Sequence, residues 1–301
     1  MPAMLLDCGV DPANLLHAAT APASEQNCSL LDAISGGQRP DFDGPFQVGC
    51  PVTWLEGDQV CSALKQFGRV MFLGDSFTRH QAQTFWMLVR DDFVHGALQH
   101  WQPLANQGGC RCDFQYNDGR SQCREHSMAY FPGPGGIFCK SWKSKTHVTF
   151  HEMYGPESFH APTVRAAFND STYNRTADVA KMGPLHYLLD YERIRQDWGE
   201  PFMREVELAP LPVTVIFLTM HRPQVEKKPL QYRDSQGPAA VAAYNDKLRA
   251  WAAGYNATVF DTYTITTNAT SYDGTHFGLA VNTVISQLLL NTIAQMTGVA
   301  L

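Results

Sequence analysis

A serine in the setting of a nucleophile stands at position 76. Four apolar residues, Val70 to Leu73, run directly into Gly74-Asp75-Ser76, and a segment with the apolar spacing of an amphipathic helix follows. This pattern predicts a buried strand that turns sharply into a helix, with Ser76 at the turn. The N-terminus of a helix offers backbone N–H donors and the positive end of its dipole, which suit a developing oxyanion. The alternative is that Asp75 or Ser76 only caps the helix.

A serine nucleophile needs a base, and the segment SYDGTHFG supplies a candidate. Asp273 and His276 stand three residues apart, just before the last predicted helix. A carboxylate on one ring nitrogen fixes the tautomer of an imidazole and stabilises its protonated form, while the other nitrogen takes the proton of the serine. Alone, Asp-X-X-His would be a capping aspartate beside a surface histidine. Together the two motifs predict a triad of Ser76, His276 and Asp273.

The elements that must position these residues alternate between strand and helix. Strands are predicted at 70–73, 147–154, 213–220 and 258–263, and helices after Ser76, over 185–198 and 239–255, and from residue 277 onward. This alternation is typical of an α/β fold with a largely parallel sheet and helices on both faces. In such sheets ligands bind at the carboxyl ends of the strands, which is where Ser76 lies. Residues 106–140 are predicted to be loops held by disulfides.

With these motifs the chain resembles the SGNH (GDSL-like) hydrolase superfamily. Its wider layout is similar to the PC-esterase branch, which includes the plant trichome birefringence-like polysaccharide O-acetyltransferases. The resemblance is carried by the cysteine-containing approach to Gly-Asp-Ser, by Arg79 and Gln81 after it, and by the segments THVTFHEMYGP, VTVIFLTMHRP and DGTHF. It implies an SGNH-like three-layer sandwich over residues 66–301, with residues 1–65 as an irregular, cysteine-containing wrap packed on it.

The resemblance also implies roles for individual residues. Ser76 would be the nucleophile and its amide part of the oxyanion hole, His276 the general base and then acid, and Asp273 the orienting carboxylate. An acetyl group would pass through an acetyl-serine to a sugar hydroxyl or to water. No cofactor or metal is expected for this chemistry, and the partners would be a carbohydrate and an acetyl donor.

The chain departs from the pattern of the plant members at two places. Gly274 and Phe277 stand where those members have Cys and Trp, which predicts the loss of one disulfide and one aromatic contact. The second departure concerns the Asn-X-Gly block, whose Asn supplies an oxyanion donor. The closest segment, KMGPLHY, has Gly183 but carries Lys181 and Met182 where an Asn should be. Asn174 or a backbone amide of residues 133–136 could replace that donor.

Cysteines and sequons indicate the compartment. The eight cysteines all lie in the first half of the chain, and five Asn-X-Ser/Thr sequons are present, at Asn27, Asn169, Asn174, Asn256 and Asn268. An even cysteine count with several sequons favours a disulfide-bonded glycoprotein of the secretory pathway, in the Golgi lumen or outside the cell. The alternative is a zinc site formed by Cys110, Cys112, Cys123 and Cys139, although the CxC start lacks the usual ligand spacing.

Charge and hydropathy exclude some classes of protein. The formal net charge is −6, which argues against a nucleic-acid binder. Residues 277–301 carry no charge, but polar side chains interrupt their helical apolar stripe, so a core helix is expected rather than a membrane span. The N-terminus shows no signal peptide, so a leader or anchor is expected to be absent from this sequence.

Several conspicuous residues have ordinary interpretations. The histidines at positions 126, 147, 151, 160 and 221 lack partners at metal-ligand spacing. Trp86 and Trp101 are expected in the core. Trp142, Tyr154 and Trp198 could stack on sugar rings, but packing is the preferred interpretation. Arg79 is expected to bond the edge of the sheet rather than a substrate.

Three functions remain open from the sequence. The first is a glycan or polysaccharide O-acetyltransferase, which the overall resemblance favours. The second is a secreted carbohydrate acetylesterase, which the same serine chemistry would serve. The third is an inactive carbohydrate-binding protein on the same fold, which the missing Asn favours.

Overall fold

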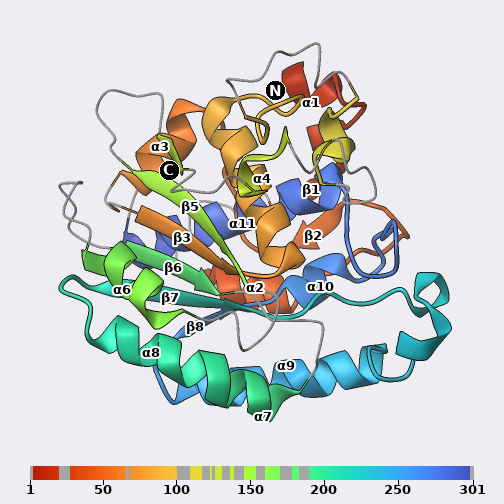
Figure 1. Ribbon diagram of the computed structural model, residues 1–301. Helices are drawn as coiled ribbons and strands as arrows, with labels where there is room; N and C mark the ends of the chain where they lie inside the picture. Colours follow the sequence, from red (N-terminus) through yellow and green to blue (C-terminus); the bar gives the residue numbers. More distant parts are fainter. Residues whose placement is uncertain are drawn as a thin grey trace.

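A six-stranded, mostly parallel sheet forms the centre of the molecule (Figure 1). The computed structural model describes residues 3–19, 28–65, 67, 69–99, 109–116, 123, 126–130, 136–138, 146–153, 160–169, 178–182 and 190–298. The sheet order is β4-β5-β3-β6-β7-β8. Its strands are β3 (Arg69–Gly74), β4 (Gly136–Phe138), β5 (His147–Glu152), β6 (Asp178–Met182), β7 (Val213–Leu218) and β8 (Thr258–Phe260).

The strand order makes β3 the switch point of the sheet. β5 and β6 flank β3 on its two sides in parallel, so the chain leaves β3 in one direction first and then in the other. β4 is antiparallel to β5, and the remaining neighbours are parallel. Ligands of open α/β sheets bind at such a switch point, beyond the carboxyl ends of the strands. The end of β3 at Gly74 is therefore where the topology favours a site.

Alternate residues of β3 face two separate hydrophobic cores. Val70 and Phe72 belong to a core with α4 (Ser76–Arg90) and α11 (Leu279–Thr297). Met71 and Leu73 belong to a core with α6 (Ala161–Asn169), α8 (Glu200–Glu207) and α9 (Pro238–Ala253). Figure 1 shows these helix layers on opposite sides of the sheet. A strand buried on both faces must be apolar throughout, which is why residues 70–73 show no alternation. The predicted α/β class with helices on both faces is confirmed.

Residues 3–64 contain short elements rather than an irregular wrap alone. These are α1 (Ala3–Leu6), α2 (Leu30–Ser35), α3 (Asp58–Leu64) and a parallel pair, β1 (Leu16–Ala18) with β2 (Phe46–Val48). Their buried side chains, such as Leu30, Phe46 and Val60, join the same core as α4 and α11. This segment therefore shares its core with the sheet.

Helix α11 bonds this N-terminal segment through amide side chains. The Oε1 of Gln287 accepts from the N–H of Leu55 at 2.9 Å, and its Nε2 donates to the carbonyl of the same residue at 2.7 Å. Asn291 makes the same pair of bonds to Thr53, at 2.9 and 2.8 Å. Gln295 bonds the N–H of Leu30 at 2.9 Å. By length and composition α11 could cross a membrane, but 83% of its apolar window is buried inside the molecule, as expected of a core helix.

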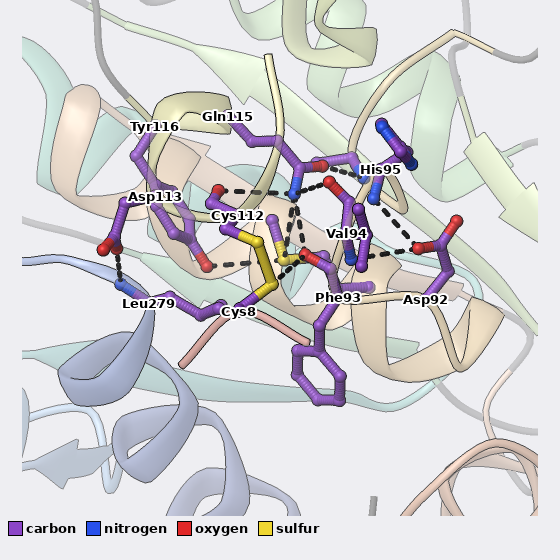
Figure 2. The surroundings of a disulfide bond; sticks show 12 residues. Cys8, Asp92, Phe93, Val94, His95, Cys112, Asp113, Gln115, Tyr116 and Leu279 are labelled. Atoms are coloured by element: carbon purple, nitrogen blue, oxygen red, sulfur yellow. Dashed lines mark hydrogen bonds between the residues drawn. A yellow bond between two sulfur atoms is a disulfide. The ribbon is translucent and has the colours of Figure 1, made fainter. Parts of the chain in front are cut away.

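Disulfides hold the loops beside this segment. Cys8 is bonded to Cys112, Cys28 to Cys50, and Cys110 to Cys123. Cys61 is also disulfide-bonded, and Cys139 lies outside the described residues. Figure 2 shows the Cys8–Cys112 bond beside Gln115, whose Nε2 donates to the carbonyls of Phe93 and Val94 at 2.9 and 3.0 Å. The predicted disulfide framework is confirmed for these cysteines, and the zinc alternative is wrong because three of its four sulfurs are in disulfides. Disulfides persist in oxidising compartments.

Other sequence predictions fare unevenly. β5, β7 and β8 lie within the strands predicted at 147–154, 213–220 and 258–263, and α9 and α11 correspond to the helices predicted over 239–255 and from residue 277 onward. The predicted strand 258–263 is too long, because Asp261 caps a short helix, α10 (Thr262–Thr266). The predicted helix 185–198 lies partly outside the described residues, and its remainder is α7 (Tyr191–Ile194) followed by a π-helical turn (Arg195–Gly199). β4 lies in the region predicted as loop, and β6, α6 and α8 were not predicted.

Candidate active site

Ser76 is the first residue of α4, directly after a sharp turn. Gly74, the last residue of β3, has a φ of 148°, which favours glycine. The side chain of Asp75 then accepts a hydrogen bond from the N–H of Phe77 at 3.1 Å and caps the helix. The capping residue is therefore Asp75, and the hydroxyl of Ser76 is left for another partner. The Ser76 residue is buried, with 6% exposed.

That partner is His276, which is 200 residues away in the sequence. The Oγ of Ser76 lies 2.6 Å from Nε2 of His276. On the other side of the ring, Nδ1 of His276 lies 2.7 Å from Oδ2 of Asp273. The structure thus brings the three predicted residues into one hydrogen-bonded chain.

Asp273 sits in a tight turn that holds both of its oxygens. Its Oδ1 accepts from the backbone N–H of Thr275 at 2.8 Å and of His276 at 2.7 Å. A bridge between Ser271 and Phe277 closes the turn, so residues 271–277 form a small hairpin. It is called the catalytic hairpin below because it carries two residues of the predicted triad. Because Asp273 and His276 are linked both through the backbone and through the side chain, their relative geometry is fixed locally.

The environment keeps Asp273 ionised. Burial raises the pKa of this carboxyl, but the hydrogen bond and charge of His276 and the amides of His276 and Thr275 together outweigh it and hold the pKa well below its usual range. A carboxylate facing Nδ1 favours the tautomer with the proton on Nδ1. Nε2 is then the acceptor, which is the state a general base for the serine hydroxyl requires.

A second histidine, His80, packs beside His276. It lies one helical turn after Ser76, is 2% exposed, and its ring centroid is 5.2 Å from that of His276. Burial, reinforced by the positive charges of Arg79, His276 and His221, holds the pKa of His80 well below its usual range. His80 therefore fills this side of the site as a neutral ring. The sequence reasoning missed it, although its i+4 spacing from Ser76 places it on the same helix face.

Arg79 and Gln81 anchor the helix that carries the serine. Arg79 is 1% exposed and pairs with Glu152, the last residue of β5, at 3.3 Å. It was expected to bond the sheet edge, but β5 is an inner strand. Gln81 bonds Asn282 of α11, and Ser286 of α11 donates to its Oε1 at 3.2 Å. These bonds tie the serine helix to the helix that follows the catalytic hairpin.

A segment after β7, residues 224–236, supports the catalytic hairpin. Gln224 accepts from the N–H of Ser271 at 2.8 Å and donates its own N–H to the carbonyl of Gly274 at 3.1 Å. The buried ammonium of Lys228 donates to Oγ1 of Thr275 and, at 3.1 Å, to Gln236. Burial lowers the pKa of Lys228, and the charge of Asp273 opposes that shift. No sequence pattern pointed to this support, because it depends on two loops meeting.

The packing of this support explains one departure from the plant pattern. Gly274 has a φ of +87°, and a Cβ there would lie 2.7 Å from the carbonyl oxygen of Gln224 and 2.9 Å from the N of Lys228. A cysteine therefore has no room at this position. The expected loss of an aromatic contact at Phe277 is wrong, because its ring is 1% exposed and meets the ring of His221 edge-on at 5.4 Å.

The sequence offers several candidates for a second oxyanion donor. Gly183, Asn174 and residues 133–135 lie outside the described residues, while Gly136 begins β4. Lys181 and Met182 end β6, and Met182 is paired with Leu73 of β3. β6 therefore ends beside the turn that carries Ser76. The amide of Ser76 is in the first turn of α4, where N–H groups have no intrahelical acceptor.

The remaining candidates have structural roles where they are described. Trp86 is fully buried, and Trp198 is 3% exposed and packs in the core rather than in a sugar cleft. Trp101, Trp142 and Tyr154 lie outside the described residues. His160 bonds Thr163 at 2.8 Å, and burial followed by the charge of Arg69 lowers the pKa of His151 to about 4. The ring of His221 lies 4.5 Å from that of Phe77, which in turn lies 5.4 Å from the ring of His276. The described residues contain no group of three or more His, Cys, Asp or Glu that could hold a metal.

Two cavities differ in what they can hold. An apolar one between β7 and the helices α7 and α9, lined by Trp198 and Trp251 among others, has a volume of about 20 Å³, room for about one water. A second one, with a volume of about 250 Å³, lies at the start of α11 beside the catalytic hairpin.

Comparisons with known proteins assign no family. No family's sequence profile matches the chain, and no curated protein matches it. Among solved structures, a member of the lipolytic protein G-D-S-L family from Veillonella parvula is 14% identical with a TM-score of 0.38, and the match covers 77% of this chain and 99% of that one. A carbohydrate acetylesterase from Sinorhizobium meliloti is 11% identical with a TM-score of 0.39, covering 76% and 99%. With TM-scores this low, neither likeness decides the function.

Proposed function

We propose that the protein is a serine-dependent acyl-ester enzyme that transfers acetyl groups on carbohydrate, as a glycan or polysaccharide O-acetyltransferase. The observation that carries the proposal is the 2.6 Å hydrogen bond between Oγ of Ser76 and Nε2 of His276, with Asp273 on the far side of the ring. A serine hydroxyl at a strand-to-helix turn, bonded to an imidazole that a carboxylate orients, has the parts that nucleophilic acyl transfer needs.

The first half of the reaction acylates the serine. Nε2 of His276 takes the hydroxyl proton as Oγ of Ser76 attacks the acetyl carbonyl, and the carbonyl π electrons move to oxygen. The amide of Ser76, at the N-terminus of α4, donates to that oxyanion. When the intermediate collapses, the bond to the leaving oxygen breaks and His276 returns its proton to that oxygen. Asp273 stabilises the imidazolium throughout, and the product is an acetyl-serine.

The second half repeats these steps in reverse with a new hydroxyl. His276 takes the proton of a sugar hydroxyl, whose oxygen attacks the acetyl carbonyl, and Ser76 leaves with the proton that His276 returns. If water takes the place of the sugar, the same residues make a secreted carbohydrate acetylesterase. One observation favours this second candidate: the side chain of Asp273 is 44% exposed, so water reaches the catalytic hairpin.

A chromogenic acetyl ester tests the proposal. The parent protein should release the chromophore and react covalently with a fluorophosphonate probe, and Ser76→Ala should do neither. Adding an oligosaccharide acceptor separates the two candidates: acetylated oligosaccharide in the products indicates a transferase, and acetate alone indicates an esterase. Equal labelling of parent and Ser76→Ala would overturn the role of Ser76. A parent that neither releases the chromophore nor reacts with the probe would leave an inactive carbohydrate-binding protein as the remaining function.

A further inference from the structure

The 250 Å³ pocket lies next to the catalytic hairpin. Thr270 and Gly278, which line it, directly flank the bridge that closes this hairpin between Ser271 and Phe277. Asp113, also in the lining, accepts a hydrogen bond from the N–H of Leu279 at the start of α11 (Figure 2). Three residues after Asp113, the ring of Tyr116 packs on His80 at 5.1 Å, and His80 in turn packs on His276. The pocket is thus linked to His276 in two ways. One is the catalytic hairpin itself, and the other is the ring contacts of Tyr116 with His80 and of His80 with His276.

The lining combines hydrogen-bonding groups with apolar surface. Asp43 and Asp113 offer carboxylate oxygens, and Arg39 and Asn14 offer N–H donors. Both oxygens of Asp43 already accept bonds from Thr270, one from its N–H at 2.6 Å, which fixes the carboxylate in place. Leu15, Leu279 and Val281 provide the apolar part. A ligand for such a pocket carries several hydroxyls and also C–H faces.

Arg39 supplies the pocket with a buried guanidinium that hydrogen bonds hold in place. It is 5% exposed, and its Nε and Nη1 donate to the carbonyls of Ile265 and Gly44. Its Nη2 makes no hydrogen bond to the described part of the chain, and we expect a ligand oxygen to accept one from it. With Asp43 and Asp113 the pocket has one positive and two negative side chains. This balance disfavours an anionic ligand.

Three exposed aromatic residues stand close in sequence to residues that line the pocket. Phe42, next to Asp43, is 63% exposed, and Phe114, next to Asp113, is 38% exposed. Tyr272 of the catalytic hairpin is 45% exposed and stacks on the ring of His276, with centroids 5.8 Å apart. Large apolar side chains gathered in the open mark binding surfaces. Aromatic faces also suit the C–H faces of sugar rings.

We propose that this pocket is a subsite for one neutral sugar ring of the glycan acceptor, next to the ring that is acetylated. The inference rests on the proposed function for the reaction, but the binding it claims does not need catalysis. A volume of about 250 Å³ is slightly below the roughly 300–1,000 Å³ of small-molecule sites, which fits a single ring rather than a longer stretch. The N-terminal segment contributes Asn14, Leu15, Arg39 and Asp43, so it would take part in choosing the substrate.

Two variants test the subsite without touching Ser76, His276 or Asp273. Ala280→Phe places a ring in the pocket from the first turn of α11, and Phe42→Ala removes the exposed aromatic side chain that precedes Asp43 in the chain. Matched controls lie on the opposite face of the sheet: Ala253→Phe at the exposed end of α9, and Leu208→Ala, 70% exposed, after α8. The thermal unfolding temperatures of all four variants should stay close to that of the parent.

Isothermal titration with cellotetraose, xylotetraose, mannotetraose, chitotetraose and tetragalacturonate measures binding. At least one neutral tetrasaccharide should bind the parent, and Ala280→Phe and Phe42→Ala should weaken it by about tenfold or more while both controls bind as the parent does. Turnover of p-nitrophenyl acetate should stay within about twofold in all four variants. The subsite would be overturned if no neutral tetrasaccharide binds the parent, or if Ala280→Phe binds as tightly as the parent does. It would also be overturned if tetragalacturonate binds more tightly than the neutral tetrasaccharides. A parent protein that does not turn over p-nitrophenyl acetate would instead count against the proposed reaction.

Discussion

Replacing Asp273 by Asn tests the catalytic reasoning most sharply, because the structure dictates how the new side chain must sit. Oδ1 of Asp273 accepts from two backbone N–H groups, those of Thr275 and His276. An Asn keeps both bonds only if its carbonyl oxygen takes the place of Oδ1. Its NH₂ group then replaces Oδ2, 2.7 Å from Nδ1 of His276. In the flipped orientation, the NH₂ group of the Asn would instead face the backbone N–H groups of Thr275 and His276, so donors would face donors.

The consequence is a reversed imidazole. An NH₂ facing Nδ1 can only donate, so the ring proton moves to Nε2, which then donates to Ser76 instead of accepting its proton. In a serine protease the corresponding change lowers kcat by about 10⁴, or about 5.5 kcal/mol at roughly 1.4 kcal/mol per factor of ten. We expect Asp273→Asn to lose about 10³ to 10⁴ in kcat. Its stability should fall by only about 1 kcal/mol, because the hydrogen bonds of the turn survive.

The assay is kcat on p-nitrophenyl acetate together with thermal unfolding. Asp273→Ala is the comparison that also loses the two bonds of the turn and should unfold at a lower temperature. Asp190→Asn is the control, since Asp190 caps α7 through a bond to the N–H of Arg193 at 3.2 Å, far in sequence from the proposed triad. A kcat for Asp273→Asn within tenfold of the parent, in a folded variant, would refute the assigned roles of Asp273 and His276.

The pH dependence of stability gives a second readout of the same residue. The pKa of Asp273 is held below its usual range, so its ionised form contributes stability above the ordinary value of about 3.9. That contribution is lost as the pH falls from this value toward the lowered pKa. The parent's stability advantage over Asp273→Asn should therefore shrink as the pH falls below about 4. An advantage that grows as the pH falls below this value would contradict this assignment.

Three further predictions concern other parts of the molecule. Lys228→Met should lower kcat on p-nitrophenyl acetate by about tenfold, because it removes the donor to Thr275 and a charge facing Asp273, and Lys228→Arg should recover part of the loss; equal kcat in all three would show that the lysine does not support the hairpin. If KMGPLHY leaves the oxyanion hole without its side-chain donor, Met182→Asn or Lys181→Asn should raise kcat, since one such donor is worth about 10²–10³; no gain beside brisk parent activity would mean that another group fills the hole. In a eukaryotic secretory host Asn256, exposed in the turn before β8, should carry a glycan, and an intact mass unchanged by Asn256→Gln would contradict this.

The sequence was informative where structure is local. The turn at Ser76 and the turn at Asp273 each depend on a few consecutive residues, so their patterns can be read directly from the chain. A buried parallel strand such as β3 also has a signature, because it must be apolar on both faces. The distance between Ser76 and His276 could not be predicted, since it depends on how the sheet brings residues 200 positions apart together.

What the sequence did not reveal depends on contacts between distant segments or on weak patterns. β6 escaped prediction because Asp178 and Lys181 give its short sequence, DVAKM, no apolar run. Gln224 and Lys228 support the hairpin from a loop whose own sequence has no periodicity. In the sequence, the amides of Gln287, Asn291 and Gln295 only interrupt the apolar stripe of α11. In the structure, each of them bonds the backbone of the N-terminal segment.

Those amide bonds also set an order of events during synthesis. The residues that bond Thr53 and Leu55 come off the ribosome 238 and 232 positions later, which at about 5–20 residues per second is on the order of 10 to 50 seconds. Until α11 emerges, the N-terminal segment lacks these hydrogen bonds and the part of its core that α11 supplies. Cys28 and Cys50, 22 positions apart, can join early, but Cys8 must wait for Cys112. The N-terminal segment can therefore complete its contacts only after residue 279 and the helix that follows have been synthesised.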